Sequence, residues 1–463
     1  MSVFHLSWMK AIAESLRMKL CHEREEENVS LVSRDELGHT YGDQSDESQT
    51  FGLGSPVESS REKITTWEAG WNVTNAVQGI FVLGLPYALL QSGYLGLLFL
   101  MLSPLICSYT GKILVSCLYE EDENGHLVRV RQTYEDIANV CFRHLCPCLG
   151  GKLVIGAQLL ELLMTCILYL VVSSNLICHS LFFSLPVSPL VCSAAIFLML
   201  VPCMLIRDLR VVSKLSFFCS LAQFLITFLI IGYCLHQSEQ WQSRNLGAEA
   251  VNFDGFQVGL GVIIFSYTSQ IYLPTLEESM RNPSDFSVMM DWTHTLACGM
   301  KTSLSLLAFL TWGEQTKEVI SDNLPSTLRV LVNLCLLVKA LLSYPLPFFA
   351  AAEILQRSVL RSNSSSEWSD RWKLVIRGVL LLTTLLVAMC VPRFSLLMGL
   401  TGSVSGASMS LMLPALFHLK LKWNQMNSPW KILDVTVFLF GFFCSVSGLV
   451  CSIKQIIAAF EQD

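Results

Sequence analysis

The sequence predicts an all-α polytopic membrane protein with about 11 transmembrane helices, two of them interrupted. The first observation is composition: 52% of the 463 residues are hydrophobic and 15% are charged, whereas roughly 25% charge is usual in soluble domains. The second is a series of eleven apolar segments, most of them near the ~20 residues that a membrane helix needs. The third is that two segments carry helix-breaking and polar residues at membrane depth, where such residues are tolerated only if they face protein or a water-filled cavity.

The apolar segments begin after a polar N-terminal stretch. Residues 1–62 are rich in charged and turn-forming residues, so we predict a disordered cytosolic tail, with Phe4–Leu20 as a candidate amphipathic helix. Residues 63–463 are predicted to form the transmembrane domain. Its expected segments are Trp67–Leu90, Gly93–Leu118, Leu153–Ile177, Leu190–Ile206, Val212–Leu235, Phe256–Leu276, Met290–Trp312, Leu328–Ala352, Leu374–Val391, Phe394–His418 and Leu433–Ile453.

The basic residues of the connecting loops predict the orientation of the chain. They gather after segments two, four, six, eight and ten, whereas the loops at 236–255 and 313–325 contain only Arg244 and Lys317. Loops rich in Lys and Arg stay on the cytosolic side. We therefore expect a cytosolic N-terminus and, because the number of spans is odd, a C-terminus on the opposite side.

The first and sixth segments carry matching interruptions. Each has a Leu-Pro pair near its end, in GLPYA (Gly84–Ala88) and in IYLPT (Ile271–Thr275). Paired interrupted helices predict a transporter built from inverted repeats, segments one to five and six to ten, with the eleventh added. We place the first break at Ala76–Gly79 and expect Pro86 to shape the end of that helix. In the sixth segment the polar patch Ser266–Gln270 would unwind and offer backbone groups to an ammonium and a carboxylate.

Three ionisable residues lie inside apolar segments. A carboxylate at membrane depth is costly and usually functional, so Glu161 is predicted to titrate or to contact a substrate, with a packing hydrogen bond as the alternative. Thr165 and Tyr169 share its helical stripe. Lys301 is as compatible with function as with packing, and Lys339 is interpreted as a packing or snorkelling lysine. An ion pair between Glu161 and a lysine would lower the burial cost of both groups.

The remaining features are interpreted structurally. Tyr344–Pro347 should kink segment eight, and Gly399, Gly402 and Gly406 should form a small-residue packing face. The cysteines and histidine in Cys141–Cys148 do not have a zinc-site spacing, so we predict no metal site there and favour unpaired or palmitoylated thiols. Nucleotide-binding and hydrolase motifs are missing from the sequence, and the net charge of -6 does not suggest nucleic-acid binding. These observations argue against an enzyme.

Seven stretches of the chain resemble a single family. They are TTWEAGWNVTNAVQGIFVLGLPYA, SYTGKILVSCLYEE, QLLELLMTCILYLVVSSNL, FSYTSQIYLPTLE, NLPSTLRVLVN, KALLSYPLPFFAA and FSLLMGLTGSVSGA. From about Lys63 to the C-terminus the chain resembles the amino acid/auxin permease family, and within it the transporters that load GABA and glycine into synaptic vesicles. The tail and the loop near Ser362–Asp370 look shorter than in that family.

The resemblance implies a LeuT-type 5+5 inverted repeat with broken helices 1 and 6. It implies transport of GABA and glycine, with beta-alanine as a further candidate, across the lipid bilayer of the synaptic vesicle. The driving force would be the proton gradient of a vacuolar proton ATPase; no cofactor is implied beyond protons and, for a co-transport mechanism, chloride. By position, Glu161 and Lys301 are the proton-coupling candidates. The substrate-binding candidates are Asn75, Gln78, Gly79, Tyr169, Phe265, Ser266, Tyr267, Thr268 and Tyr344.

Two alternatives remain at this point. One is a plasma-membrane or lysosomal amino acid transporter, and the other is a non-transporting amino acid sensor that signals through its tail. Proton exchange and chloride co-transport also both remain open.

Overall fold

The computed structural model describes residues 63–143, 149–180, 189–202, 209–243, 253–360, 366–390 and 394–462. The chain divides into two units, Met1–Arg61 and Glu62–Asp463, and all described residues belong to the second. The predicted tail 1–62, its candidate helix and residues 144–148 of the cysteine cluster lie outside the described residues.

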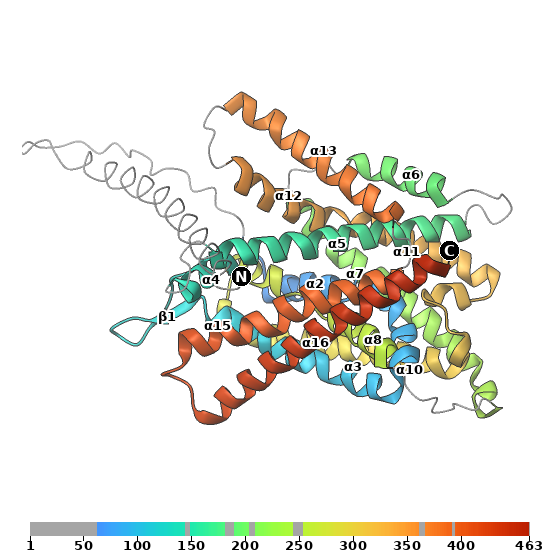
Figure 1. The fold of residues 1–463 in the computed structure, drawn as a ribbon, viewed down its shortest axis with the longest axis horizontal. Helices are drawn as coiled ribbons and strands as arrows, with labels where there is room; N and C mark the ends of the chain where they lie inside the picture. Colours follow the sequence, from blue (N-terminus) through green and yellow to red (C-terminus); the bar gives the residue numbers. More distant parts are fainter. Residues whose placement is uncertain are drawn as a thin grey trace, which may run out of the picture. The chain divides into compact units, whose positions relative to one another are not determined.

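The second unit is a bundle of long helices (Figure 1). Among the described residues, eight helical stretches are long and apolar enough to cross a membrane, and Val191–Leu200 is a shorter apolar helix. The all-α polytopic fold class is thus confirmed, whereas the number of eleven transmembrane helices stays a prediction. One reason is that the long helix Phe286–Trp312 contains Asp291 and Lys301, and such charges lower the apolarity by which a span is recognised.

The described elements correspond to the expected segments, but several helices, such as α13 and α16, extend beyond the expected bounds. In chain order, the elements of the first half are α2 (Thr66–Val77), η2 (Ile80–Gly84), α3 (Leu85–Ser116), β1 (Tyr119–Glu121), β2 (Leu127–Arg129), α4 (Tyr134–Phe142), α5 (Leu149–Ser180), α6 (Pro189–Leu200), α7 (Leu209–His236), η4 (Ser238–Ser243), α8 (Phe253–Ser266), η5 (Gln270–Tyr272) and α9 (Leu273–Ser279). After these come η6 (Pro283–Asp285), α10 (Phe286–Trp312), η7 (Gly313–Gln315), η8 (Ile320–Asn323), α11 (Ser326–Ser343), α12 (Pro345–Leu360), α13 (Ser366–Cys390), α14 (Phe394–Thr401), η9 (Gly402–Gly406), η10 (Ser408–Met412), α15 (Leu413–Lys422) and α16 (Ser428–Gln462).

Helix α3 combines the end of the first expected segment with most of the second. Gly93 lies between the two parts with φ 60° and ψ -154°, outside the helical region. A glycine adopts a positive φ without the steric cost that a side chain adds. The chain therefore turns at Gly93, where the sequence analysis placed the start of the second segment.

The loop after α3 contains a β-hairpin that the sequence analysis does not anticipate. Strands β1 and β2 pair antiparallel, with Tyr119 opposite Arg129, and Gly125 provides the turn with φ 76°. Strands of three residues are too short to reveal an alternating pattern in the sequence. The hairpin marks one end of the helix bundle, which we call the hairpin end (Figure 1).

Glycines bring α14 and η9 against α8. A Cβ atom on Gly402 would lie 1.9 Å from the carbonyl oxygen of Gly261, and one on Gly399 would lie 2.6 Å from a methyl group of Val258. Backbone this close cannot accept a side chain. The predicted small-residue packing face is therefore confirmed, and Gly402–Gly406 adopts a π-helical turn there.

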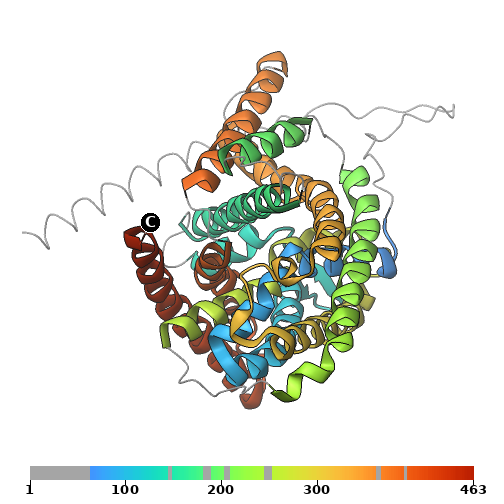
Figure 2. The ribbon, with the colours of Figure 1, turned by 90° about the vertical axis from the view of Figure 1, so that its right-hand side faces the viewer.

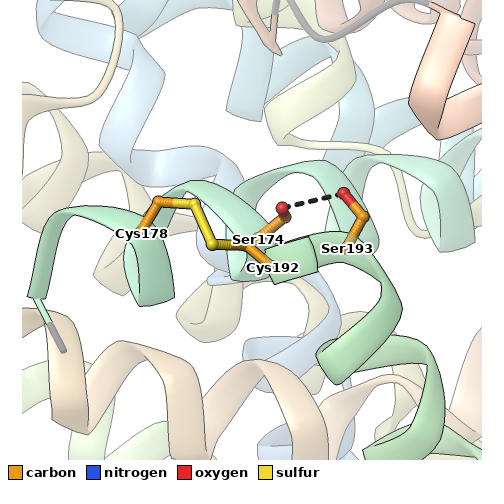
Figure 3. The surroundings of a disulfide bond; sticks show 4 residues. All are labelled: Ser174, Cys178, Cys192 and Ser193. Carbon is orange, nitrogen blue, oxygen red and sulfur yellow. Dashed lines mark hydrogen bonds between the residues drawn. A yellow bond between two sulfur atoms is a disulfide. The ribbon is translucent and has the colours of Figure 1, made fainter. Parts of the chain in front are cut away.

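Helix α5 lies between two groups of helices. Viewed from the end opposite the hairpin, α5 lies between α6 and α13 on one side and the blue and yellow-green broken segments on the other (Figure 2). A disulfide joins Cys178, near the end of α5, to Cys192 in α6. The hydroxyls of Ser174 and Ser193 lie 2.9 Å apart beside it (Figure 3). The sequence does not predict this bond, because both cysteines lie among apolar residues.

Candidate functional site

Both predicted helix breaks are present. Helix α2 ends at Val77, Gln78 caps it, and Gly79 is extended with ψ 177°. Helix α8 ends at Ser266, and Tyr267–Ser269 are not helical. The predictions of a first break at Ala76–Gly79 and of an unwound polar patch in the sixth segment are confirmed.

The two Leu-Pro pairs have the same structural role. After each break comes a short 3₁₀ turn, and then a helix whose second residue is proline: Pro86 in α3 and Pro274 in α9. Proline suits the first turn of a helix because its missing N–H would be unpaired there. Pro86 thus stands in the first turn of a new helix, so the expectation that it shapes a helix end is wrong. The shared order of break, turn and Leu-Pro helix agrees with an internal repeat.

A buried lysine binds the carbonyl end of each first half-helix. Lys301 of α10 is fully buried, donates to the Ser266 carbonyl of α8 and lies 3.9 Å from the centre of the Tyr267 ring. Lys339 of α11 is 1% exposed and donates to the Gln78 carbonyl at 2.6 Å. The interpretation of Lys339 as a snorkelling lysine is therefore wrong. Helix C-termini carry unpaired carbonyls and partial negative charge, which cations stabilise.

Glu161 of α5 also lies at the second break. Its carboxyl group is 3% exposed and lies within hydrogen-bonding reach of Thr268. Among the described residues, Oε2 of this carboxyl has no hydrogen-bond partner. The structure therefore brings Glu161 and Lys301 to the same break, where Glu161 is next to Thr268 and Lys301 contacts Ser266. Their role in proton coupling stays a prediction.

The expected ion pair between Glu161 and a lysine is not present. Neither Lys301 nor Lys339 lies within ion-pair distance of Glu161, and both ammonium groups instead contact backbone carbonyls. This expectation was wrong because it treated opposite charges as the only partners for a buried lysine. A helix C-terminus offers an alternative that needs no carboxylate.

Aromatic rings join the two breaks. Phe81, just after the first break, lies 4.9 Å from the ring of Phe265 and 5.6 Å from that of Tyr169, measured between centroids. Tyr169 and Glu161 share a stripe of α5, and the Thr165 hydroxyl between them donates to the Glu161 carbonyl at 2.8 Å. The candidate residues Tyr169 and Phe265 thus meet at one place, through a phenylalanine that the sequence analysis did not single out.

Unpaired polar atoms gather around both breaks. Buried polar groups normally have a hydrogen-bond partner, so such atoms mark where a ligand, ion or water can bind. Asn75 donates to Ser216 at 3.3 Å through its amide nitrogen. Within the described part of the chain, the buried atoms without a partner include Asn75 Oδ1, both polar atoms of the Gln78 side chain, Tyr267 Oη and Ser269 Oγ.

Some candidates have partners of their own. The hydroxyls of Ser266 and Thr268 donate to carbonyls within their own turn, at 2.8 and 2.9 Å. The Tyr344 hydroxyl lies 3.5 Å from Thr384 of α13, and its ring stacks on Phe348. Tyr344 does occupy the predicted kink, since α11 ends at Ser343 and α12 begins at Pro345. A substrate contact for these three side chains stays a prediction.

The described part of the chain also contains a cavity of about 200 Å³. Helices α3, α8, α14 and α16 line it, and its polar groups include Gln91, Glu318, Ser395 and Gln455. None of the candidate binding residues lines this cavity.

At the hairpin end, a polar cluster holds the second half of broken helix 6. We call it the α9 clamp: Arg129, Tyr119 and Glu277. Arg129 contacts Glu277 of α9 at 2.8 Å, and Tyr119 donates its hydroxyl to the same carboxylate. Burial and this hydrogen bond raise the pKa of Tyr119 to about 12, so the hydroxyl remains a donor. Beside the clamp, Ile64 pairs with Ser279 and Arg281 through backbone hydrogen bonds of 2.8 and 2.9 Å.

Known proteins match the chain in sequence over most of its length. The family described as "Transmembrane amino acid transporter protein" matches residues 62–454. The vesicular inhibitory amino acid transporter of Xenopus tropicalis is 50% identical over 91% of this chain and 83% of its own. The human protein of that name is 48% identical over 89% and 80%. The vesicular GABA transporter of Caenorhabditis elegans is 37% identical over 86% and 81%.

Solved structures support the fold independently. A manganese transporter of Eremococcus coleocola aligns with a TM-score of 0.54 at 11% identity, covering 89% of this chain and 91% of its own. A nucleobase-cation-symport-1 family transporter aligns with a TM-score of 0.53 at 10% identity, covering 87% and 93%. Both have the LeuT-type fold, which confirms that part of the prediction. The chain therefore belongs to the transmembrane amino acid transporter family, and within it groups with the vesicular inhibitory amino acid transporters.

Proposed function

We propose that this protein loads GABA and glycine, with beta-alanine as a further substrate, into synaptic vesicles. The driving force is the proton electrochemical gradient made by a vacuolar proton ATPase. One observation carries the proposal: Glu161 and Lys301 meet the same helix break inside a membrane domain. The relatives named as vesicular transporters of inhibitory amino acids support the choice of substrate and membrane.

The substrate binds between the two breaks in this proposal. Its carboxylate meets backbone N–H groups near Gly79, and its ammonium meets the carbonyl end of α8 and the Tyr267 ring. Lys301 already contacts the Ser266 carbonyl and that ring. The substrate ammonium can take this place only after Lys301 has moved or lost its proton, so the two cations exclude each other. Such mutual exclusion makes substrate binding depend on the state of Lys301.

Glu161 holds the exchanged proton in this scheme. Its carboxyl group is buried on helix α5, and the Oε2 atom has no hydrogen-bond partner in the described part of the chain. An ionised carboxylate in such a place is costly, so the neutral form prevails until the site opens to water. Opening to the cytosol then releases the proton, and opening to the acidic lumen restores it.

The same proposal includes an orientation. The N-terminus faces the cytosol and the C-terminus faces the lumen, in keeping with the basic loops. The disulfide Cys178–Cys192 supports this, because it lies at the end of α5 away from the hairpin. Disulfides persist in oxidising, non-cytosolic compartments.

The test is uptake of radiolabelled GABA, glycine and alanine by proteoliposomes, with pH and voltage gradients imposed separately. Wild-type protein should accumulate GABA and glycine when the lumen is acidic. The Glu161→Gln variant should lose this accumulation but still exchange labelled for unlabelled GABA without a gradient. Glu314→Gln, which changes an exposed acid in the loop before α11, is the matched control.

Other outcomes would point elsewhere. Unchanged gradient-driven uptake by Glu161→Gln removes its coupling role, and binding without flux in the wild-type protein indicates a sensor. Uptake that requires chloride on the same side as GABA supports co-transport over proton exchange. Localisation of the tagged protein in neurons separates a vesicular from a lysosomal or plasma-membrane transporter.

A further inference from the structure

Lys339 joins three helices at the first break. Its Nζ atom donates to the Gln78 carbonyl of α2 and to the Gln223 side-chain oxygen of α7, each at 2.6 Å. The Gln223 amide is itself oriented, since its nitrogen donates to Thr227 at 3.2 Å. Lys339, on α11, is buried along its whole length. In the described part of the chain no carboxylate lies within ion-pair distance of this ammonium.

The partners of Lys339 are a backbone carbonyl and a side-chain amide oxygen, which are also ligand types for hard metal cations. The end of a half-helix concentrates carbonyl oxygens and partial negative charge. Transporters with broken helices commonly bind their coupling cations at such ends. Here a side chain from a different helix occupies the position, with backbone and amide oxygens as its partners.

We propose that Lys339 is a positioning residue: a tethered cation that holds the end of α2 against α7 and α11. The transport cycle then needs no inorganic cation at this break. The inference rests on the proposed function, because α2 carries the candidate binding residues Asn75 and Gln78. Lys339 acts through α2 on the substrate site and does not itself carry the exchanged proton.

The test removes the Lys339 ammonium group by mutation and replaces it with an amine added to the solution. Lys339→Ala deletes three carbons and the nitrogen, which together correspond to n-propylammonium. Exchange of labelled for unlabelled GABA is measured with equal pH on both sides, so that an added amine cannot act by dissipating a gradient. We expect Lys339→Ala to lose at least about tenfold in exchange rate, because a hydrogen-bonded charge is lost from a buried site.

Rescue distinguishes a positioning cation from a purely structural side chain. We expect n-propylammonium to restore part of the exchange by Lys339→Ala, whereas n-propanol and the longer n-hexylammonium do not. Lys317→Ala, an exposed lysine in the loop before α11, should exchange normally with or without amine. A folded Lys339→Ala variant that no amine restores, or wild-type exchange by the uncharged Lys339→Met, would overturn the proposal.

A measurement on the wild-type protein tests the same inference without relying on a variant that folds. Exchange should proceed equally with sodium, potassium or N-methylglucamine as the only bulk cation, and a strict requirement for an inorganic cation would contradict the inference. A different result would contradict the proposed function. In that case wild-type protein shows no acid-driven accumulation, while the cation and amine experiments can still be run on any amino acid that it exchanges.

Discussion

At the scale of residues, the second break is organised by a lysine and a tyrosine ring. Lys301 is fully buried, and the Tyr267 ring covers it on one side while the Ser266 carbonyl accepts its hydrogen bond. A cation over an aromatic face contributes about 2 kcal/mol when both are shielded from water. The Tyr267 hydroxyl, in contrast, has no partner among the described residues. The ring and the hydroxyl can therefore be tested separately.

Two substitutions at Tyr267 make this separation. Tyr267→Leu removes the ring and should raise the KM for GABA by up to roughly 30-fold, the equivalent of about 2 kcal/mol. Tyr267→Phe keeps the ring and should stay within about threefold of the wild-type KM. The measurement is initial uptake against GABA concentration in proteoliposomes. A Tyr267→Phe variant as impaired as Tyr267→Leu would show that the hydroxyl, and not the ring, contacts the substrate.

At the scale of elements, the two half-helices of each broken helix are held by different means. Lysines hold the first halves, α2 and α8, by their carbonyl ends. The second half of broken helix 6, α9, is held at the hairpin end by Arg129 and Tyr119 through Glu277. Glu277 is 1% exposed, so its charge depends on these partners. Removing one member of such a buried pair costs about 3–5 kcal/mol of folding free energy, because the other charge is left buried without a partner.

The α9 clamp gives a prediction with an internal control. Arg129→Gln should lower the unfolding temperature of the purified protein, because Glu277 is left without its cation. Adding Glu277→Gln to that variant should recover much of the loss, since no charge remains buried. Glu278, which lies 3.7 Å from Arg129 but is 56% exposed, should tolerate Glu278→Gln with little change in unfolding temperature. A double variant less stable than Arg129→Gln alone would contradict this account.

At the scale of the whole molecule, the two ends of the bundle differ in chemistry. The hairpin end carries the α9 clamp, and the opposite end of α5 carries the disulfide Cys178–Cys192. An oxidised pair belongs on the side away from the reducing cytosol. The position of the disulfide and the basic loops support the proposed orientation for two independent physical reasons.

The orientation can be tested on sealed vesicles. A membrane-impermeant phosphine should leave Cys178–Cys192 intact in vesicles whose cytosolic face is outward, and should reduce it once detergent is added. After existing thiols are blocked, a polyethylene-glycol maleimide reports the released cysteines as a gel shift. The Cys178→Ser/Cys192→Ser variant should show no such shift. Reduction of the bond in sealed vesicles would reverse the proposed orientation.

The sequence by itself determined the membrane class, the positions of both breaks and the buried acid. These are local signals: a membrane helix needs an apolar run, and Gln78-Gly79 and Tyr267-Thr268-Ser269 place polar and small residues within one. Only the tertiary structure decided which groups meet. Hydropathy does not show which face of one helix points at another. The sequence therefore suggests an ion pair between Glu161 and a lysine, whereas Lys301 binds the end of α8. For the same reason the sequence suggests only a packing role for Lys339, although its side chain reaches Gln78, 261 positions away in the chain.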